Sequence, residues 1–179
     1  TGKRSFLRNL LNFYIKYNFQ NIYFLAGFKG DKIYKLYHNK VFNCIKTKVE
    51  IEKKPLGTGG SLYYLKKKIK NDFIVINGDS YLDYDFSEFL KFKKKKNKII
   101  LIQNKNYKSN TKLSNLNLDK KNKSIILDNK SKFMNAGVYY FKKNILNFVE
   151  KKKMSLENDI IFKLIQKKIL FGFVSKNYF

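Results

Sequence analysis

The sequence predicts an α/β protein whose mostly parallel sheet is covered by helices on both faces. Amphipathic helical segments alternate with short apolar runs, and several of these runs are continuous, as in 73–76 and 99–102. A strand buried on both faces needs apolar residues at every position. Strands that alternate with crossover helices pair in parallel, and ligands of such sheets bind beyond the carboxyl ends of the strands.

The elements follow one another along the chain. Apolar residues at helical spacing predict helices over 4–18, 30–38, 61–69, 86–92 and 155–168. Apolar runs bounded by turn residues predict strands over 22–25, 49–51, 73–76, 99–102, 134–141 and 170–174. Residues 104–132 form a polar excursion, in which 112–118 and 124–127 are expected to pair. We therefore predict one domain over residues 1–179, interrupted by this excursion.

The formal net charge of +26 suggests a nucleic-acid partner, because basic proteins gain affinity by displacing counterions from phosphates. Only Arg4 and Arg8 are arginines, however, and proteins that read bases use the planar arginine fork. The surplus of lysine, asparagine and isoleucine is typical of a coding bias, with lysines on solvated faces. We expect no nucleic-acid partner, and a lysine-rich nucleic-acid binder is the alternative that tight binding at physiological salt would support.

The single cysteine and the hydropathy bear on location. One cysteine excludes an intramolecular disulfide, so a reducing, cytoplasmic compartment is expected. Cys44 lies in an apolar context and is expected to be buried. No apolar run reaches the roughly 20 residues that cross a bilayer, so no membrane partner is expected. The sequence gives no oligomeric state.

A glycine-rich loop enters the helix predicted at 61–69. Gly57, Gly59 and Gly60 open left-handed torsions and leave no side chain between main chain and ligand. A loop that feeds a helix N-terminus also presents unpaired N–H groups to a phosphate or a base, and Thr58 adds a hydroxyl. The dinucleotide and P-loop spacings are both absent, so this loop taken alone predicts a tight structural turn equally well.

Asp79 follows the apolar run 73–76, so its carboxylate is expected at the end of that strand. Mg²⁺ between phosphates takes one or two carboxylates and keeps several waters, which favours a metal role for Asp79. We interpret Asp83 and Asp85 as turn and cap residues. Asn135 opens the strand 134–141 and could contact a hydroxylated ligand, although its spacing alone favours an ordinary strand start.

Together these segments resemble the sugar-1-phosphate nucleotidyltransferases, in particular the branch of heptose-1-phosphate and mannose-1-phosphate guanylyltransferases. The resemblance covers nearly the whole chain, in the family's order. Its segments are Gly2-Lys3 with Phe6-Leu7, Ala26-Gly27-Phe28-Lys29-Gly30, Pro55-Leu56-Gly57-Thr58-Gly59-Gly60, Ile76-Asn77-Gly78-Asp79-Ser80, Asn135-Ala136-Gly137-Val138-Tyr139 and Ser155-Leu156-Glu157-Asn158-Asp159-Ile160. Arg4 stands where the first segment of the family has proline. Ser155 is also expected to cap its helix.

The resemblance implies a Rossmann-like three-layer α/β/α nucleotide-diphospho-sugar transferase fold and a Mg²⁺-dependent reaction. A sugar 1-phosphate would attack the α-phosphorus of a nucleoside triphosphate, with GTP favoured, giving a nucleotide-sugar and pyrophosphate. The implied nucleotide-binding residues are Leu56, Gly57, Thr58 and Gly59, and Asp79 would hold the metal. The implied sugar-binding residues are Asn135, Ala136, Gly137 and Glu157, with Asp159 as the alternative to Glu157.

The chain departs from the family at both ends. The GGxGTRL loop and the following KP lysine, which bind the triphosphate, would lie before Thr1, and a second metal aspartate would lie after Phe179. The family's glutamate in an EKP-type segment is absent, and Asp128 is the one candidate for its counterpart. The fold is thus expected to be incomplete at the N-terminus, no catalytic residue is assigned, and residues 1–179 alone are expected to be inactive.

Two further alternatives stay open beside the enzyme and the nucleic-acid binder. One is a non-catalytic, regulatory relative that binds the ligands without turnover. The other is a metal-dependent glycosyltransferase of related fold, which would want an Asp-x-Asp pair that Asp79-Ser80-Tyr81 does not provide.

Overall fold

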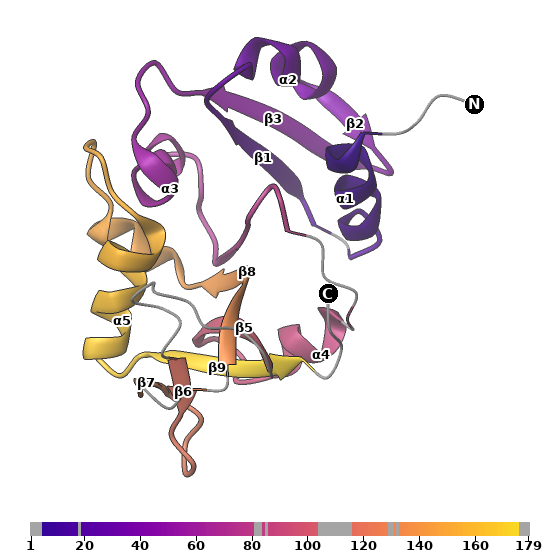
Figure 1. Ribbon diagram of the computed structural model, residues 1–179. Helices are drawn as coiled ribbons and strands as arrows, with labels where there is room; N and C mark the ends of the chain where they lie inside the picture. Colours follow the sequence, from indigo (N-terminus) through magenta and orange to yellow (C-terminus); the bar gives the residue numbers. More distant parts are fainter. Residues whose placement is uncertain are drawn as a thin grey trace.

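The computed structural model describes residues 5–17, 19–80, 84, 86–103, 116–128, 131 and 133–175, and their strands form two sheets (Figure 1). The three-stranded sheet has the order β1-β3-β2, with β1 and β3 parallel and β2 antiparallel to β3. The six-stranded sheet has the order β7-β6-β8-β5-β9, and β4 pairs with β8. The strands are β1 Asn21–Ala26, β2 Lys40–Phe42, β3 Ile45–Ile51, β4 Phe73–Ile76, β5 Asn97–Gln103, β6 Leu116–Leu118, β7 Ile125–Leu127, β8 Phe133–Phe141 and β9 Leu170–Ser175.

Most helices lie in the segments where helical spacing predicts them, whereas the short helices over 57–60, in the glycine loop, and over 143–148 were not predicted. The α-helices are α1 Phe6–Tyr14, α2 Gly30–Tyr37, α3 Gly57–Gly60, α4 Phe86–Lys91 and α5 Phe162–Gln166. Short 3₁₀ helices run over Ser61–Leu65 and Lys143–Phe148, and a π-helical turn over Leu156–Ile161 leads into α5. Among the described residues, no helix is long and apolar enough to cross a membrane.

Strand β8 organises the larger sheet. It is antiparallel to β4, β5 and β6, whereas β5 and β9 are parallel to each other. The predicted α/β class is confirmed, but the expectation of a mostly parallel sheet was wrong, because among the described strands only β1–β3 and β5–β9 pair in parallel. The antiparallel direction of β8 was not predicted, because an apolar run that is buried on both faces carries no signal of strand direction. The predicted pairing inside the polar excursion is confirmed for its described part, where β6 and β7 are antiparallel.

The two faces of β5 carry two hydrophobic cores, as a side-chain period of two requires. Ile99 and Leu101 pack in the core that contains α5, and Ile100 and Ile102 pack in the core that contains α4. Helix α1 joins the two sheets, because its Leu10 packs with α4 whereas Leu11 packs in a third core on β1 and β3. The larger sheet is therefore covered on both faces.

The turn between β2 and β3 corrects one expectation. Asn43 and Cys44 both have positive φ, 46° and 66°, which is the geometry of a tight two-residue hairpin turn. Cys44 is exposed, so the expectation that it is buried was wrong. The apolar neighbours belong to the strands, and the turn directs the cysteine outward.

Lys98 of β5 is a fully buried lysine that holds the end of α4. Its Nζ donates to the carbonyl oxygens of Phe89 at 2.9 Å and Leu90 at 3.1 Å, and lies 4.4 Å from the ring centroid of Tyr140. The carbonyls at a helix C-terminus favour a cation. Burial nevertheless lowers the pKa of Lys98 from 10.5 to about 8.

We expect this buried lysine to make the protein more stable as the pH rises from 8 toward 10.5. In that interval the unfolded chain keeps a proton that folded Lys98 has lost, so the free energy of unfolding increases with pH. Between pH 7.5 and 10 the gain is about 2 kcal/mol. Denaturant titrations of wild type and Lys98→Met at the two pH values test this, since other groups titrate in both proteins. Equal changes in the two proteins would contradict it.

Candidate functional site

The glycine loop packs backbone to backbone against the segment 152–156. The N–H groups of Gly59 and Gly60 donate to the carbonyl oxygen of Met154 at 3.0 and 3.2 Å, and Met154 N–H donates to Leu56 O at 2.8 Å. Gly57 has φ +74°, and a Cβ on it would lie 2.6 Å from that same Met154 oxygen. The glycines are thus required by a close approach as well as by a turn. Two of the N–H groups expected to face a ligand are used within the protein.

Thr58 of this loop is connected to Glu157. Its Oγ1 accepts the N–H of Leu156 at 2.9 Å and donates to Glu157 Oε2 at 3.3 Å. Ser155 Oγ donates to the same Glu157 oxygen at 3.2 Å. Segments almost 100 residues apart in the sequence therefore meet at one carboxylate.

The predicted cap at Ser155 is confirmed. Its Oγ accepts the N–H of Asn158 at 3.1 Å, while its own N–H donates to Asp159 Oδ2 at 2.7 Å. The reciprocal bond therefore comes from the fourth helical position instead of the third, where the chain forms a wide π-helical turn. Asp159 closes the helix start, and Glu157 is left to face the glycine loop.

The other oxygen of Glu157 reaches Asn135 through a tyrosine. Tyr139 OH donates to Glu157 Oε1 at 3.1 Å and accepts from Asn135 Nδ2. Burial and the negative charge of Glu157 raise the pKa of Tyr139 far above its ordinary value, so the hydroxyl keeps its proton. This role of Tyr139 was not predicted from the sequence. A tyrosine in a buried apolar strand was the available signal, because its hydroxyl needs a partner.

A bulge in β8 brings Asn135 to the end of β4. Ile99 pairs with Tyr139 and Leu101 with Asn135, so β8 has two more residues than β5 between these pairs. Gly137 lies in the bulge with φ +72°, and its N–H donates to Asn135 Oδ1 at 2.9 Å. The Asn135 side chain is thereby fixed over the bulge.

The turn that carries Asp79 rests on this bulge. Asn77 N–H donates to Gly137 O at 2.9 Å, and Ser80 N–H donates to Asn77 O at 3.2 Å. A Cβ on Gly137 would lie 2.9 Å from Asn77 Nδ2 and 3.0 Å from Ser80 Oγ. A side chain at position 137 would therefore crowd Asn77 and Ser80, and the positive φ there also favours glycine.

Asp79 is exposed at the carboxyl end of β4, as predicted. Among the described residues its hydrogen-bond partner is Ser80 Oγ, 3.3 Å from Oδ1, and no lysine or arginine is within ion-pair distance. An unpaired carboxylate in so basic a chain fits a divalent cation. The described residues contain no group of three or more metal-ligating side chains, so phosphate and water oxygens would complete the coordination. Asp83 and Asp85 lie outside the described residues.

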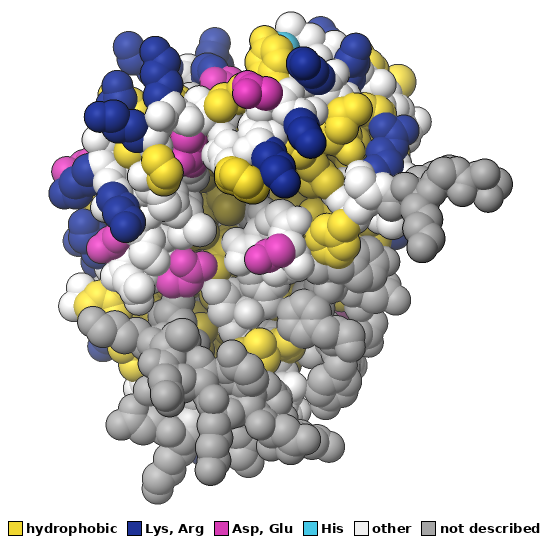
Figure 2. Space-filling view, turned by 45° about the horizontal axis from the view of Figure 1, so that its top comes forward, with side chains coloured by type: hydrophobic (Ala, Val, Ile, Leu, Met, Phe, Trp, Pro, Cys, Tyr) yellow, Lys and Arg dark blue, Asp and Glu magenta, His cyan; other side chains and the backbone are white. Residues whose placement is uncertain are grey.

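The structure also describes the remaining predicted residues, Leu56, Ala136 and Asp128. Leu56 is half-buried, and its N–H donates to Glu52 Oε2 at 3.0 Å. Ala136 is 1% exposed and packs in the core with α4, so only its backbone could face a ligand. Asp128 accepts from Asn117 Nδ2 at 2.8 Å within the polar excursion. Figure 2 shows lysines and arginines spread over the upper part and the left side of one face, with several carboxylates toward its middle.

Comparison of the sequence with known proteins identifies a family and several relatives. The family described as Nucleotidyl transferase matches residues 3–177. The D-glycero-alpha-D-manno-heptose 1-phosphate guanylyltransferase of Campylobacter jejuni is 31% identical over 159 residues, which cover 86% of this chain and 70% of that protein. The bifunctional protein GlmU of Methanocaldococcus jannaschii is 31% identical over 140 residues, which cover 75% of this chain and 32% of that protein.

A solved structure shows the same arrangement of elements. The crystal structure of HddC from Yersinia pseudotuberculosis complexed with GMP-PN superposes with a TM-score of 0.73 at 27% identity. The match covers 98% of this chain and 78% of HddC.

Proposed function

Because the chain belongs to the nucleotidyl transferase family, we propose that the protein transfers a nucleotidyl group from a nucleoside triphosphate to a sugar 1-phosphate. The motif resemblance to this family is confirmed. The observation that carries the proposal is the hydrogen-bonded chain Thr58–Glu157–Tyr139–Asn135, which joins the glycine loop to the bulge beside Asp79. Guanine is favoured because one relative is named a guanylyltransferase and HddC was crystallised with GMP-PN.

The residues on either side of this chain take the two substrates. We assign the nucleotide to Leu56, Gly57, Thr58 and Gly59, and the sugar to Asn135, Ala136, Gly137 and Glu157. An oxygen of the sugar phosphate attacks the α-phosphorus, and the bond to the β-phosphate breaks as pyrophosphate leaves. Catalysis then consists largely of positioning the two phosphates in line.

Asp79 would hold a Mg²⁺ ion at the carboxyl end of β4. The ion would neutralise phosphate charge and polarise the reacting phosphoryl group. The exposed Asp79 carboxylate provides one ligand, which matches the preference of Mg²⁺ for few protein ligands beside phosphate and water.

We propose a single domain over residues 1–179 and a cytoplasmic location, where the lone, exposed Cys44 would stay reduced.

The activity is proposed for the full-length protein, since this chain spans 70% of the heptose relative and 78% of HddC. The test supplies that protein with Mg²⁺, each of four nucleoside triphosphates and a panel of sugar 1-phosphates, and measures released pyrophosphate. Turnover with one pair would name both substrates. Nucleotide binding without turnover for any pair would favour a regulatory relative instead.

We expect Tyr139→Phe to raise the KM for the sugar phosphate about tenfold, because the loss of one charge-assisted hydrogen bond costs about 1.5 kcal/mol. Glu157 and Asn135 would lose the hydroxyl that orients both of them. The KM for the nucleoside triphosphate should change less than threefold. Initial rates with each substrate varied in turn separate the two effects.

Tyr140→Phe is the matched control for this substitution. It removes a neighbouring hydroxyl, which donates to Asp72 Oδ2 at 3.1 Å before the start of β4. Its KM values should stay close to wild type. Equal changes in the two variants would show that Tyr139 has no specific link to the sugar.

A further inference from the structure

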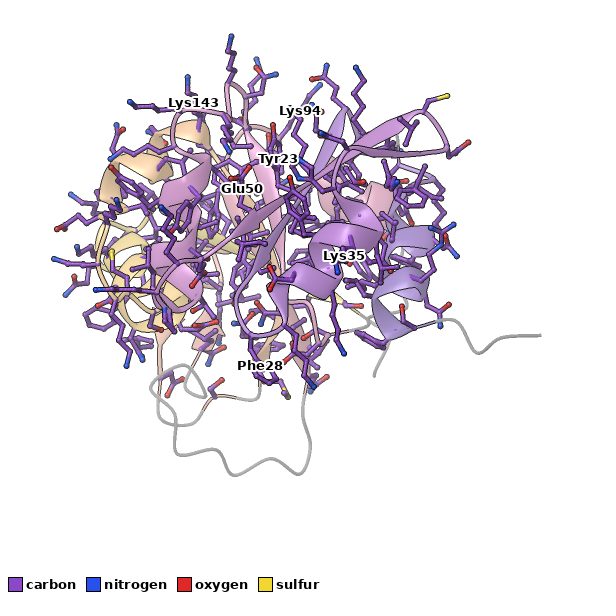
Figure 3. All side chains as sticks on the ribbon, turned by 90° about the horizontal axis from the view of Figure 1, so that it is seen from above. Tyr23, Phe28, Lys35, Glu50, Lys94 and Lys143 are labelled. Carbon is purple, nitrogen blue, oxygen red and sulfur yellow. The ribbon has the colours of Figure 1, made fainter. Side chains whose placement is uncertain are left out.

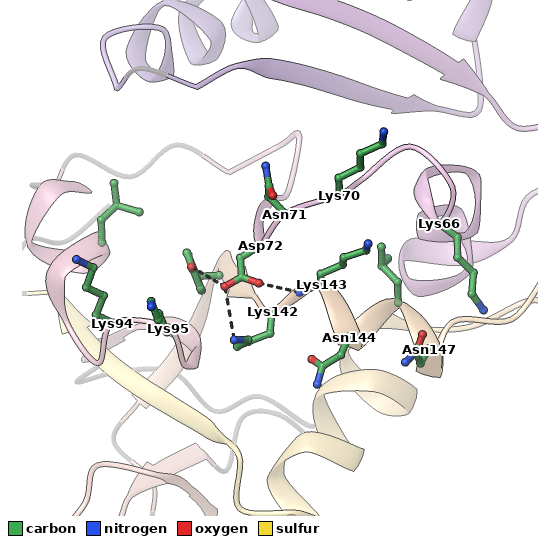
Figure 4. Close-up of a pocket in the computed structure, with 13 residues that line it drawn as sticks. Lys66, Lys70, Asn71, Asp72, Lys94, Lys95, Lys142, Lys143, Asn144 and Asn147 are labelled. Atoms are coloured by element: carbon green, nitrogen blue, oxygen red, sulfur yellow. Dashed lines mark hydrogen bonds and ion pairs between the residues drawn. The ribbon is translucent and has the colours of Figure 1, made fainter.

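A lysine-rich groove of about 960 Å³ lies at the amino end of β4 (Figure 4). It is formed by the segment before β4, the turn after α4 and the helical segment after β8. Its lysines are Lys66, Lys70, Lys94, Lys95, Lys142 and Lys143. Its other lining residues are Asn71, Asp72, Leu90, Tyr140, Asn144, Leu146 and Asn147.

The groove concentrates positive charge beyond the average of this basic chain. Six of its thirteen lining residues are lysine, whereas the whole chain has 39 lysines and arginines in 179 residues. Asp72 is its one acid, and this carboxylate is already engaged. Its Oδ1 accepts Lys143 N–H at 3.0 Å, its Oδ2 accepts Tyr140 OH at 3.1 Å, and Lys142 Nζ lies at 4.0 Å.

Several ammonium groups of the groove have no partner in the described part of the chain. No hydrogen bond or ion pair there involves the Nζ atoms of Lys70, Lys94, Lys95 or Lys143. Like charges held around one hollow repel each other, and an anion that bridges them removes this repulsion. The asparagine amides add donors that carry no charge.

The groove is separate from the candidate site. Asp72 precedes β4 and Asp79 follows it, so the two lie at opposite ends of this strand. Figure 3 shows Lys94 and Lys143 on one side of the molecule and Phe28, which follows the carboxyl end of β1, on the other. A ligand in the groove would therefore leave the proposed substrate site open.

We propose that this groove binds a small polyphosphate, a linear chain of phosphoryl groups that is either inorganic or the tail of a nucleotide. Its volume is within the range of small-molecule sites. Lysine point charges suit the spread charge of phosphates, whereas base reading would need arginine forks. Single-stranded nucleic acid also needs aromatic platforms for stacking, and the one aromatic lining residue, Tyr140, has the Nζ of buried Lys98 over its ring at 4.4 Å.

Calorimetric titration of the full-length protein with tripolyphosphate, in EDTA and about 50 mM salt, tests the proposal. The groove variant is Lys70→Gln/Lys94→Gln/Lys143→Gln, and the control variant is Lys32→Gln/Lys35→Gln/Lys46→Gln. All six side chains are exposed, so both variants should fold and both lose three charges. We expect the groove variant to bind at least tenfold more weakly and the control to stay within twofold of wild type.

Equal weakening in both variants, or no binding to wild type at millimolar tripolyphosphate, would overturn the proposal. A second titration, with GTP, identifies which group is recognised. An affinity for GTP equal to that for tripolyphosphate, with the same dependence on the groove lysines, supports recognition of the phosphate chain. Binding of GTP alone overturns it. A single-stranded oligonucleotide that binds more tightly than tripolyphosphate at physiological salt would also overturn it, in favour of nucleic acid.

Discussion

Asp79→Asn is expected to slow pyrophosphate release by the full-length protein at least a hundredfold, which corresponds to about 2.7 kcal/mol of transition-state stabilisation. The carboxylate is exposed at the end of β4, and Ser80 is its one hydrogen-bond partner in the described structure. Asparagine keeps the shape of the side chain and removes the charge that would hold the cation. The remaining activity should require more Mg²⁺, since the lost ligand acts through metal affinity.

Rates measured over a range of Mg²⁺ concentrations separate this effect from misfolding. Asp31→Asn is the matched control, because Asp31 is an exposed aspartate in the first turn of α2. It should leave both the rate and the Mg²⁺ dependence unchanged. If Asp79→Asn retains more than a third of the wild-type rate at low Mg²⁺, Asp79 is not the metal ligand.

Gly60→Ala is expected to lower the free energy of unfolding by about 3 kcal/mol, the upper end of the usual cost of overpacking. A Cβ there would overlap the carbonyl oxygen of Lys152 and lie 2.9 Å from Leu56 Cβ. The backbone of Gly60 is helical, with φ −68°. Helix propensity alone would therefore favour alanine by about 1 kcal/mol. The sign of the measured change decides between packing and propensity.

Gly27→Ala is the comparison for this substitution, since no atom lies within 4 Å of a Cβ built at Gly27. Denaturant midpoints of wild type and the two variants give the measurement. Gly27→Ala should lie within about 0.5 kcal/mol of wild type. A Gly60→Ala protein as stable as wild type would show that the contact between the glycine loop and Lys152 is loose.

The sequence was sufficient to predict what depends on local pattern. The run 73–76 predicted a strand and the position of Asp79 beyond its end, and Ser155 predicted a helix start, although this strand is half-buried instead of buried on both faces. The direction of β8 was not predictable, because its pairing depends on residues far away in the chain. The hydrogen bond from Tyr139 to Glu157 was not predictable either, because β8 contains a bulge around Gly137 that no periodicity indicates.

Local sequence pattern did not predict the features that depend on backbone geometry. The glycines of the loop were interpreted as access for a ligand, yet Gly59 and Gly60 donate their N–H groups to Met154. Cys44 was expected to be buried because of its apolar neighbours, but a tight turn exposes it. Both differences arise from backbone geometry, which composition does not report.

In the proposed site, the Glu157 carboxylate would limit how selective the sugar pocket can be. A carboxylate accepts about four hydrogen bonds, and three places are already taken by Tyr139, Thr58 and Ser155. One place, on Oε1, is left for a hydroxyl of the sugar. Glu157 could therefore bind one hydroxyl of the sugar but could not distinguish the configurations of several. Discrimination between stereoisomers of the sugar must then come from other groups around the pocket.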